Sequence, residues 1–117
     1  MPAACAIHRL NEATFEGAVL ASPLPVFVQF LESDCRECDI PGRLLGGIPR
    51  QLTGRAQCYC IHAPSHPQLT VRYCVCQFPT ILLFRDGRVS RRLVGYPLPG
   101  QLETIIRSEI GPRGAQV

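Results

Sequence analysis

Two cysteines with two residues between them, Cys35 and Cys38, are the residues of this sequence best suited to chemistry. Thiol–disulfide exchange needs one thiolate that attacks a disulfide and a second thiol that resolves the mixed disulfide. At the start of a helix, free N–H groups and the helix dipole lower the pKa of the first thiol, and one turn brings the second beside it. This pattern predicts that Cys35 attacks and Cys38 resolves.

Charged residues adjacent to the two cysteines are expected to tune them. Asp34 and Glu37 are acidic, and Arg36 is the cation that opposes them. Nearby anions disfavour a thiolate, so they raise the pKa of Cys35 and favour a reductant over a strong oxidant. The alternative is that these carboxylates are solvated and screened, in which case their effect is small.

The segments on either side of the cysteines are expected to be a strand and a helix. Residues 26–31, VFVQFL, form an apolar run in which only Gln29 is polar, as in a strand buried on both faces. Residues 40–52 should form a kinked or split helix, because Pro41 and Pro49 each lack a backbone donor.

The rest of the chain continues this alternation. Asn11 is a candidate helix cap, Asp86-Gly87 is a hairpin turn signal, and an amphipathic helix closes the chain. The order βαβαβαββα predicts an α/β fold with parallel strands and an antiparallel hairpin at one edge. We expect one domain over residues 1–110 and a flexible tail over 111–117.

Together, the Cys35–Cys38 motif, the segment QFPTILLF and the hairpin that follows it resemble the thioredoxin family. The resemblance implies a thioredoxin-like fold, a central mixed sheet of about five strands with helices on both faces. It implies a cis bond before Pro79 and substrate-binding roles for Phe78, Pro79 and Gly95. It also implies an enzyme, a protein-disulfide reductase without a cofactor or metal, acting as a monomer. Its electrons would come from an upstream thiol or a donor of the thioredoxin-reductase type.

Three departures from the family pattern bear on the redox chemistry. Asp34 stands where the family commonly has tryptophan, Gln29 where it has a buried acid, and Cys60 where a lysine often accompanies that acid. A glutamine side chain cannot titrate, so Gln29 is expected to alter the redox tuning. These departures leave a second hypothesis open, a binding module or a metal- or thiol-carrying module without efficient turnover.

Four further cysteines form two pairs with one residue between the members. Cys58 and Cys60 lie on the same face of an expected strand and are interpreted as small core residues. Cys74 and Cys76 precede Pro79 in an expected loop and are candidate accessory redox thiols. A four-thiolate zinc site is the alternative, although structural zinc pairs usually have two to four intervening residues. Neither Cys5 nor the three dispersed histidines suggest a metal ligand set.

The composition and charge of the chain argue against several classes of protein. The net charge is +3, and all twelve cations are arginines scattered along the chain, which argues against a nucleic-acid interface. No apolar run reaches the roughly 18 residues of a membrane helix, and the N-terminus lacks a secretory pattern. Seven cysteines cannot all pair within one chain. We therefore expect a cytoplasmic protein, where paired cysteines more often serve catalysis or metal binding than structure.

Overall fold

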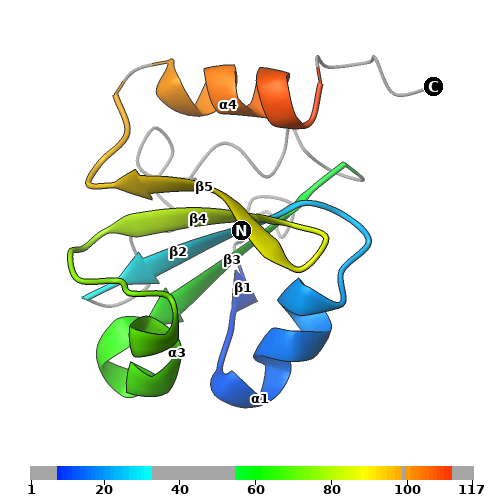
Figure 1. Cartoon of the computed structure of the whole chain (residues 1–117). Coiled ribbons are helices and arrows are strands. Elements are labelled where there is room, and N and C mark those ends of the chain that lie inside the picture. The colour runs from blue at the N-terminus through cyan, green and yellow to red at the C-terminus, as the bar shows by residue number, and fades with distance from the viewer. Residues whose placement is uncertain (1–7, 33–54, 99, 112–117) are drawn as a thin grey trace, which may run out of the picture.

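The computed structural model describes residues 8–32, 55–98 and 100–111. Their core is a five-stranded sheet in the order β1-β3-β2-β4-β5 (Figure 1). The strands are β1 (His8–Arg9), β2 (Val26–Leu31), β3 (Gln57–His62), β4 (Thr80–Arg85) and β5 (Arg88–Val94). β3 pairs in parallel with β1 and β2, whereas β4 pairs antiparallel with β2 and β5. The mixed sheet and its antiparallel hairpin are therefore confirmed.

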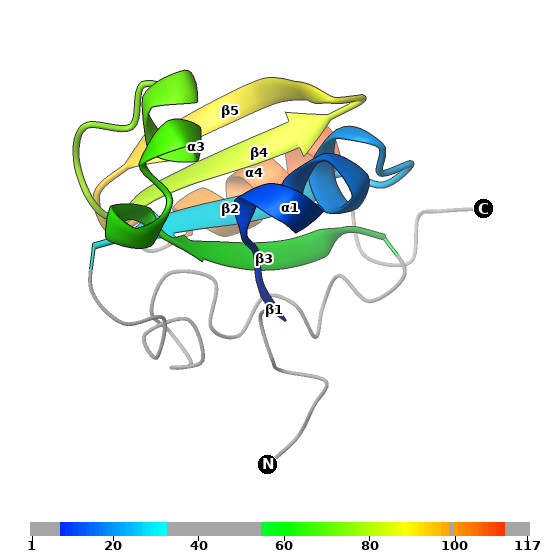
Figure 2. The same ribbon diagram turned by 90° about the horizontal axis from the view of Figure 1, so that it is seen from below.

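Strand β2 is buried along its whole length, as its apolar run predicts. Because side chains alternate along a strand, its residues divide between two cores. Phe27 and Leu31 belong to the core that includes residues of the final helix, α4 (Gln101–Glu109), whereas Val28 and Phe30 belong to the other. On that other side the sheet is covered by α1 (Glu12–Phe15) and α3 (Pro67–Arg72) (Figure 1, Figure 2). Helices thus cover both faces of the sheet, as expected.

The first helix begins at the predicted cap. The Asn11 side chain accepts a hydrogen bond from the Thr14 N–H at 3.0 Å, and the Thr14 hydroxyl oxygen accepts one from the Asn11 N–H at 3.2 Å. This reciprocal pair satisfies N–H groups that the first turn leaves without helical partners. After Phe15 the helix widens into a π-helical turn, Glu16–Leu20, which the sequence pattern did not predict.

The hairpin between β4 and β5 turns at Asp86 and Gly87, as predicted. Both residues have positive φ, 54° and 79°, as a two-residue hairpin turn of this type requires. A Cβ atom on Gly87 would also lie 3.1 Å from the Leu20 carbonyl oxygen, so glycine suits this position for two reasons.

Helix α4 is fixed to the sheet by an apolar face and by one carboxylate. Leu102, Ile105 and Ile106 are buried in the core on this side. At the end of the helix, Glu109 accepts hydrogen bonds from three side chains: Arg91 at 2.7 Å, Ser90 at 2.9 Å and Arg85 at 3.1 Å. The bonds from Arg91 and Ser90 hold the pKa of Glu109 below its ordinary value.

Several expectations lie outside the described residues. They concern the Cys35–Cys38 motif, the kinked helix over 40–52, Cys5 and the tail beyond Gly111. Of the expected first strand, His8 and Arg9 are described, and they form β1. Within the described ranges, no helix is long and apolar enough to cross a membrane.

Candidate functional site

The loop that leads into β4 brings together the three residues expected to bind substrate. The peptide bond between Phe78 and Pro79 is cis, in agreement with the expectation from the sequence. The Pro79 carbonyl accepts a hydrogen bond from the Gly95 N–H at 2.7 Å, which joins this loop to the segment that follows β5. The Thr80 hydroxyl donates to the Gln77 carbonyl at 2.6 Å and fixes the loop from its other side.

This loop lies at the end of the sheet at which strand β2 terminates. Phe30 of β2 is the register partner of Thr80, the residue directly after Pro79. The described chain continues from β2 as far as Glu32. The next residues of interest, Asp34 to Cys38, come after that point and lie outside the described residues.

Gln29 lies in the middle of the sheet and is fully buried. Its register partners are Cys60 on β3 and Ile81 on β4. By strand alternation its side chain belongs to the same face of β2 as those of Phe27 and Leu31, the face covered by α4. Positions 29 and 60, where the sequence departs from the family pattern, are therefore direct neighbours on adjacent strands.

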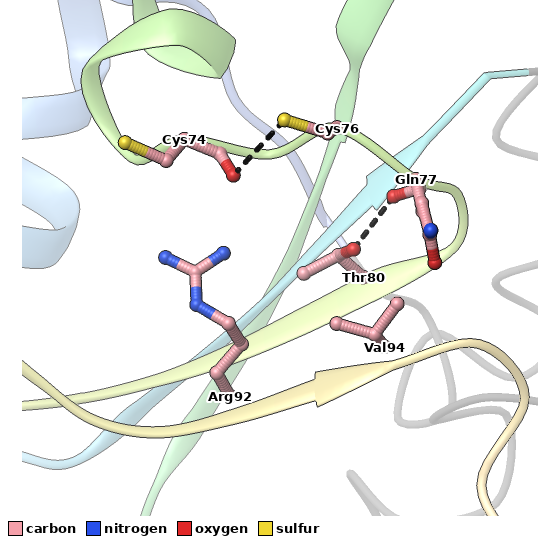
Figure 3. A pocket seen from close by; sticks show the side chains of 6 residues that line it. All are labelled: Cys74, Cys76, Gln77, Thr80, Arg92 and Val94. Atoms are coloured by element: carbon pink, nitrogen blue, oxygen red, sulfur yellow. Dashed lines mark hydrogen bonds between the residues drawn. The ribbon is translucent and has the colours of Figure 1, made fainter.

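A hollow of about 590 Å³ opens beside the Pro79 loop (Figure 3). Its lining comes from the segment before β4, from the start of β4 and from the end of β5. The lining residues are Cys74, Cys76, Gln77, Thr80, Arg92 and Val94. The two candidate accessory thiols are thus placed in one hollow, next to the residues expected to bind substrate.

The turn that carries Cys74 and Cys76 is held by Val75, which is buried between them. Both cysteines are exposed, and both are free thiols. Cys74 has a positive φ of 56°, and its carbonyl accepts the thiol hydrogen of Cys76 at a sulfur–oxygen distance of 3.7 Å. From β5, Arg92 donates a hydrogen bond to the carbonyl of Tyr73, directly before Cys74.

Cys58 and Cys60 are in the opposite environment. Both are buried in the core beneath α4, which confirms their interpretation as core residues. Burial raises the pKa of Cys58 to about 12, so its thiol is protonated at neutral pH. Among the residues that the structure describes, no three histidine, cysteine or acidic side chains gather as a metal ion would require.

Comparison with known proteins agrees with this arrangement. The family model described as thioredoxin matches residues 6–108. The chain belongs to the thioredoxin family. It is 32% identical over 77 residues to thioredoxin M3, chloroplastic, of rice (Oryza sativa subsp. japonica), covering 66% of this chain and 44% of the rice protein.

Other thioredoxins match over longer stretches. Thioredoxin 1 of Nostoc sp. is 27% identical over 90 residues, 77% of this chain and 84% of that protein. An M-type chloroplastic thioredoxin of maize (Zea mays) is 25% identical over 101 residues, 86% of this chain and 60% of the maize protein. The chain spans about half the length of the plant thioredoxins that it matches.

Arg92 and Val94, which line the hollow beside the Pro79 loop, were not predicted from the sequence as site residues. A signal for them exists in the register of the hairpin, because Val94 is the partner of Thr80, one residue after Pro79. Arg92 is two residues earlier on the same strand and so shares its face with Val94. Any position paired with the start of β4 is thereby brought to the Pro79 loop.

Proposed function

We propose that this protein is a thiol–disulfide oxidoreductase that reduces protein disulfides with Cys35 and Cys38. Membership of the thioredoxin family supports the reaction class. The observation that supports the site is the pairing of Phe30 with Thr80, because it brings the end of β2 to the Pro79 loop. Cys35 comes three residues after Glu32 in the sequence, and we propose that it acts on a substrate bound at this loop.

The proposed reaction has two exchange steps. The Cys35 thiolate attacks one sulfur of the substrate disulfide, forming a mixed disulfide and releasing the other substrate sulfur as a thiolate. The Cys38 thiolate then attacks the sulfur of Cys35, which releases the second substrate sulfur and leaves a Cys35–Cys38 disulfide. The substrate gains two electrons and two protons. An upstream thiol or a reductase of the thioredoxin-reductase type returns the protein to its dithiol form.

The Pro79 loop is the proposed binding surface for the substrate chain. The Gly95 N–H donates a hydrogen bond to the Pro79 carbonyl, and this bond fixes the loop. Among the described residues, no hydrogen bond engages the N–H or carbonyl of Phe78, so both are available to an extended peptide. Around Gly95, no atom of a described residue other than its two chain neighbours lies within 4 Å of where a Cβ would stand, which leaves room for that peptide.

Four residues are proposed to set the reducing strength of the dithiol: Gln29, Asp34, Arg36 and Glu37. Gln29 is buried and cannot exchange a proton, so the second thiol has to lose its proton to solvent or to another group. Asp34 and Glu37 are proposed to raise the pKa of Cys35, with Arg36 as a partial counterweight. Substituting Asp34→Asn together with Glu37→Gln should therefore lower the pKa of Cys35 and weaken the protein as a reductant.

The remaining features of the proposal concern the setting of this reaction. We propose a monomer whose catalytic domain spans residues 1–110, followed by a flexible tail over 111–117. We place the protein in the cytoplasm, whose reducing poise keeps the dithiol available. Nucleic acid and membranes are not among its proposed partners.

A second candidate function is a thioredoxin-fold module that binds or carries a thiol ligand or metal without efficient turnover. Buried Gln29 favours this alternative, because a side chain that cannot accept a proton at this position would leave the resolution of mixed disulfides slow. Both functions require the dithiol, but only the reductase turns over substrate. Reduction kinetics can therefore separate them.

Insulin reduction with dithiothreitol as electron source tests the proposed function. The intact chain should accelerate precipitation of the insulin B chain. Cys35→Ser should abolish the acceleration, whereas Cys38→Ser should accumulate a mixed disulfide with the substrate. Adduct formation by the Cys35 variant and none by the Cys38 variant would reverse the two roles. A single stoichiometric reduction without turnover would favour the binding module.

A further inference from the structure

The turn before the Pro79 loop holds two thiols that the proposed reaction does not use. Cys74 and Cys76 are both exposed, whereas Cys58 and Cys60 are buried. Exposure is the first requirement for a thiol that reacts with a solute. The described thiols that can react in the folded protein are therefore those of this turn.

The two exposed thiols are not equivalent. The thiol of Cys76 is directed at the Cys74 carbonyl oxygen, 3.7 Å from its sulfur. No described residue makes a hydrogen bond to the sulfur of Cys74. Cys74 is therefore the member of the pair whose sulfur can approach an incoming disulfide without first breaking a contact.

A cation lies beside Cys74. Arg92 extends from β5 toward the turn, where its Nη2 donates to the carbonyl of Tyr73 (Figure 3). An arginine has five N–H donors, so this contact fixes the guanidinium and leaves other donors for a ligand. Such a fork can bind a carboxylate through two parallel hydrogen bonds.

The surroundings have the dimensions of a small-molecule site. The hollow lined by Cys74, Arg92 and Val94 measures about 590 Å³. Sites for small ligands commonly measure about 300–1,000 Å³. The hollow also includes Gln77 and Thr80, which flank the Phe78–Pro79 bond on its two sides. A molecule bound there would cover the approach to the Pro79 loop.

We propose that Cys74 is a modification site that forms a mixed disulfide with a small carboxylate-bearing thiol, oriented by Arg92. The Cys74 thiolate attacks one sulfur of the symmetrical disulfide of that thiol. A sulfur–sulfur bond forms at Cys74, the original one breaks, and one equivalent of the small thiol leaves as thiolate. The disulfide is the oxidant, so electrons balance without another reagent.

The adduct is proposed to regulate the reductase, and this part rests on the proposed function. Attached at Cys74, the small thiol fills the hollow beside Pro79 and competes with the substrate chain. Exchange with excess free thiol reverses the modification. The protein would thereby lose activity when the ratio of small disulfide to small thiol rises.

Glutathione disulfide, which carries carboxylates, and cystamine, which carries amines, are the probes for the site. The protein is the full chain with Cys35→Ser and Cys38→Ser, so that the dithiol cannot react. Intact-mass and peptide-mapping mass spectrometry follow the adduct over time. Cys74→Ser should remove at least nine-tenths of the glutathione adduct, whereas the matched variant Cys76→Ser should retain it within about twofold. An adduct mapped to Cys76 or to another cysteine overturns the proposal.

The contribution of Arg92 is tested on the same protein. An exposed ion pair is worth up to about 1 kcal/mol, so Arg92→Gln should slow the reaction of Cys74 with glutathione disulfide about two- to fivefold. The same substitution should not slow the reaction of Cys74 with cystamine. The matched control is Arg88→Gln, an exposed arginine on the same strand that does not line the hollow. Equal effects of the two substitutions, or equal slowing of both probes, would remove Arg92 from the site.

The regulatory part needs the active dithiol and a stable modification. In a Cys76→Ser chain, the dithiol is first oxidised for protection, Cys74 is carboxymethylated with iodoacetate, and the protein is then reduced and assayed on insulin. Activity should fall at least twofold relative to a Cys74→Ser, Cys76→Ser chain treated identically. Unchanged activity overturns the regulation. Absence of insulin reduction before any treatment contradicts the proposed function and leaves the mapped adduct standing.

Discussion

Two pairs of cysteines with the same spacing have opposite environments in this molecule. In Cys58-Tyr59-Cys60 the two thiols are buried, with Cys60 fully inaccessible and Tyr59 partly exposed. In Cys74-Val75-Cys76 the two thiols are exposed and the residue between them is 6% exposed. The spacing of two cysteines therefore does not determine their chemistry, whereas the backbone that carries them does.

The difference has a simple physical origin. Strand β3 is paired on both sides, by β1 and β2, so alternate side chains are directed into the core beneath α4. The 74–76 segment leaves α3 through a residue with positive φ and is anchored by its central valine in the opposite core. One buried side chain out of three holds the turn, and the two thiols are left at the surface.

Alkylation of the native protein should show the largest difference between the two pairs. Cys74 and Cys76 should react with iodoacetamide as exposed thiols. Cys58 and Cys60 should react only during opening events, which a fold stable by about 4 kcal/mol populates roughly once in a thousand. Peptide mapping should therefore give rates about a thousandfold apart, and the difference should vanish in concentrated urea. Comparable rates in buffer would mean that β3 is not in a stable sheet.

Introducing a carboxylate should produce the second-largest difference between the two pairs, measured as a change in the free energy of unfolding. Cys60→Asp places a carboxylate at a fully buried position, so the free energy of unfolding should fall by about 3–5 kcal/mol. Cys76→Asp changes an exposed position and should stay within about 0.5 kcal/mol of the parent chain. Urea denaturation followed by circular dichroism measures both. A tolerated Cys60→Asp would show that water reaches the centre of the sheet.

At alkaline pH, the buried thiol of Cys58 should make the free energy of unfolding depend on pH. The pKa of Cys58 is about 12 in the folded chain against an ordinary 9.0, so the unfolded chain loses this proton first. The stabilisation is fully present below pH 9 and is lost as the pH rises toward 12, at no more than about 1.4 kcal/mol per unit. Cys58→Ala should show a correspondingly shallower decline than the parent chain. Parallel curves for Cys58→Ala and the parent would contradict this assignment.

The smallest expected effect concerns the backbone of the exposed turn. Cys74 has a positive φ, a conformation that costs a residue with a Cβ about 1 kcal/mol and glycine little. Cys74→Gly should therefore leave the protein unchanged or more stable by about 0.5 kcal/mol. Cys76→Gly, at a position without positive φ, should lower stability slightly. Thermal unfolding of the two variants compares them, and a clear loss for Cys74→Gly would mean that its side chain contributes to packing.

Much of the fold could be predicted from particular residues. The apolar run from Val26 to Leu31, in which only Gln29 is polar, indicated a strand buried on both faces, and Asp86-Gly87 indicated the hairpin turn. Asn11 was correctly identified as a helix cap. These signals are local, since each depends on a few adjacent side chains and the periodicity around them.

The site was harder to predict because it depends on register. Phe78, Pro79 and Gly95 came from a family resemblance, and the structure joins the last two through one backbone hydrogen bond. Arg92 and Val94 could be found only by pairing β4 with β5 residue by residue, and a bulge between Leu83 and Phe84 shifts that pairing within the hairpin. The π-helical turn after Phe15 has no sequence signal that we can identify.

The Glu109 carboxylate has a consequence for the order of folding. Its partners lie 18–24 residues away in the chain, and β4 and β5 are separated by one tight turn. Pairing β2 with β3, by contrast, requires closure of the longer connection from Leu31 to Gln57. Short loops cost less chain entropy to close, and contacts that are near in sequence form faster. The carboxyl-terminal hairpin and α4 are therefore expected to assemble before the parallel half of the sheet.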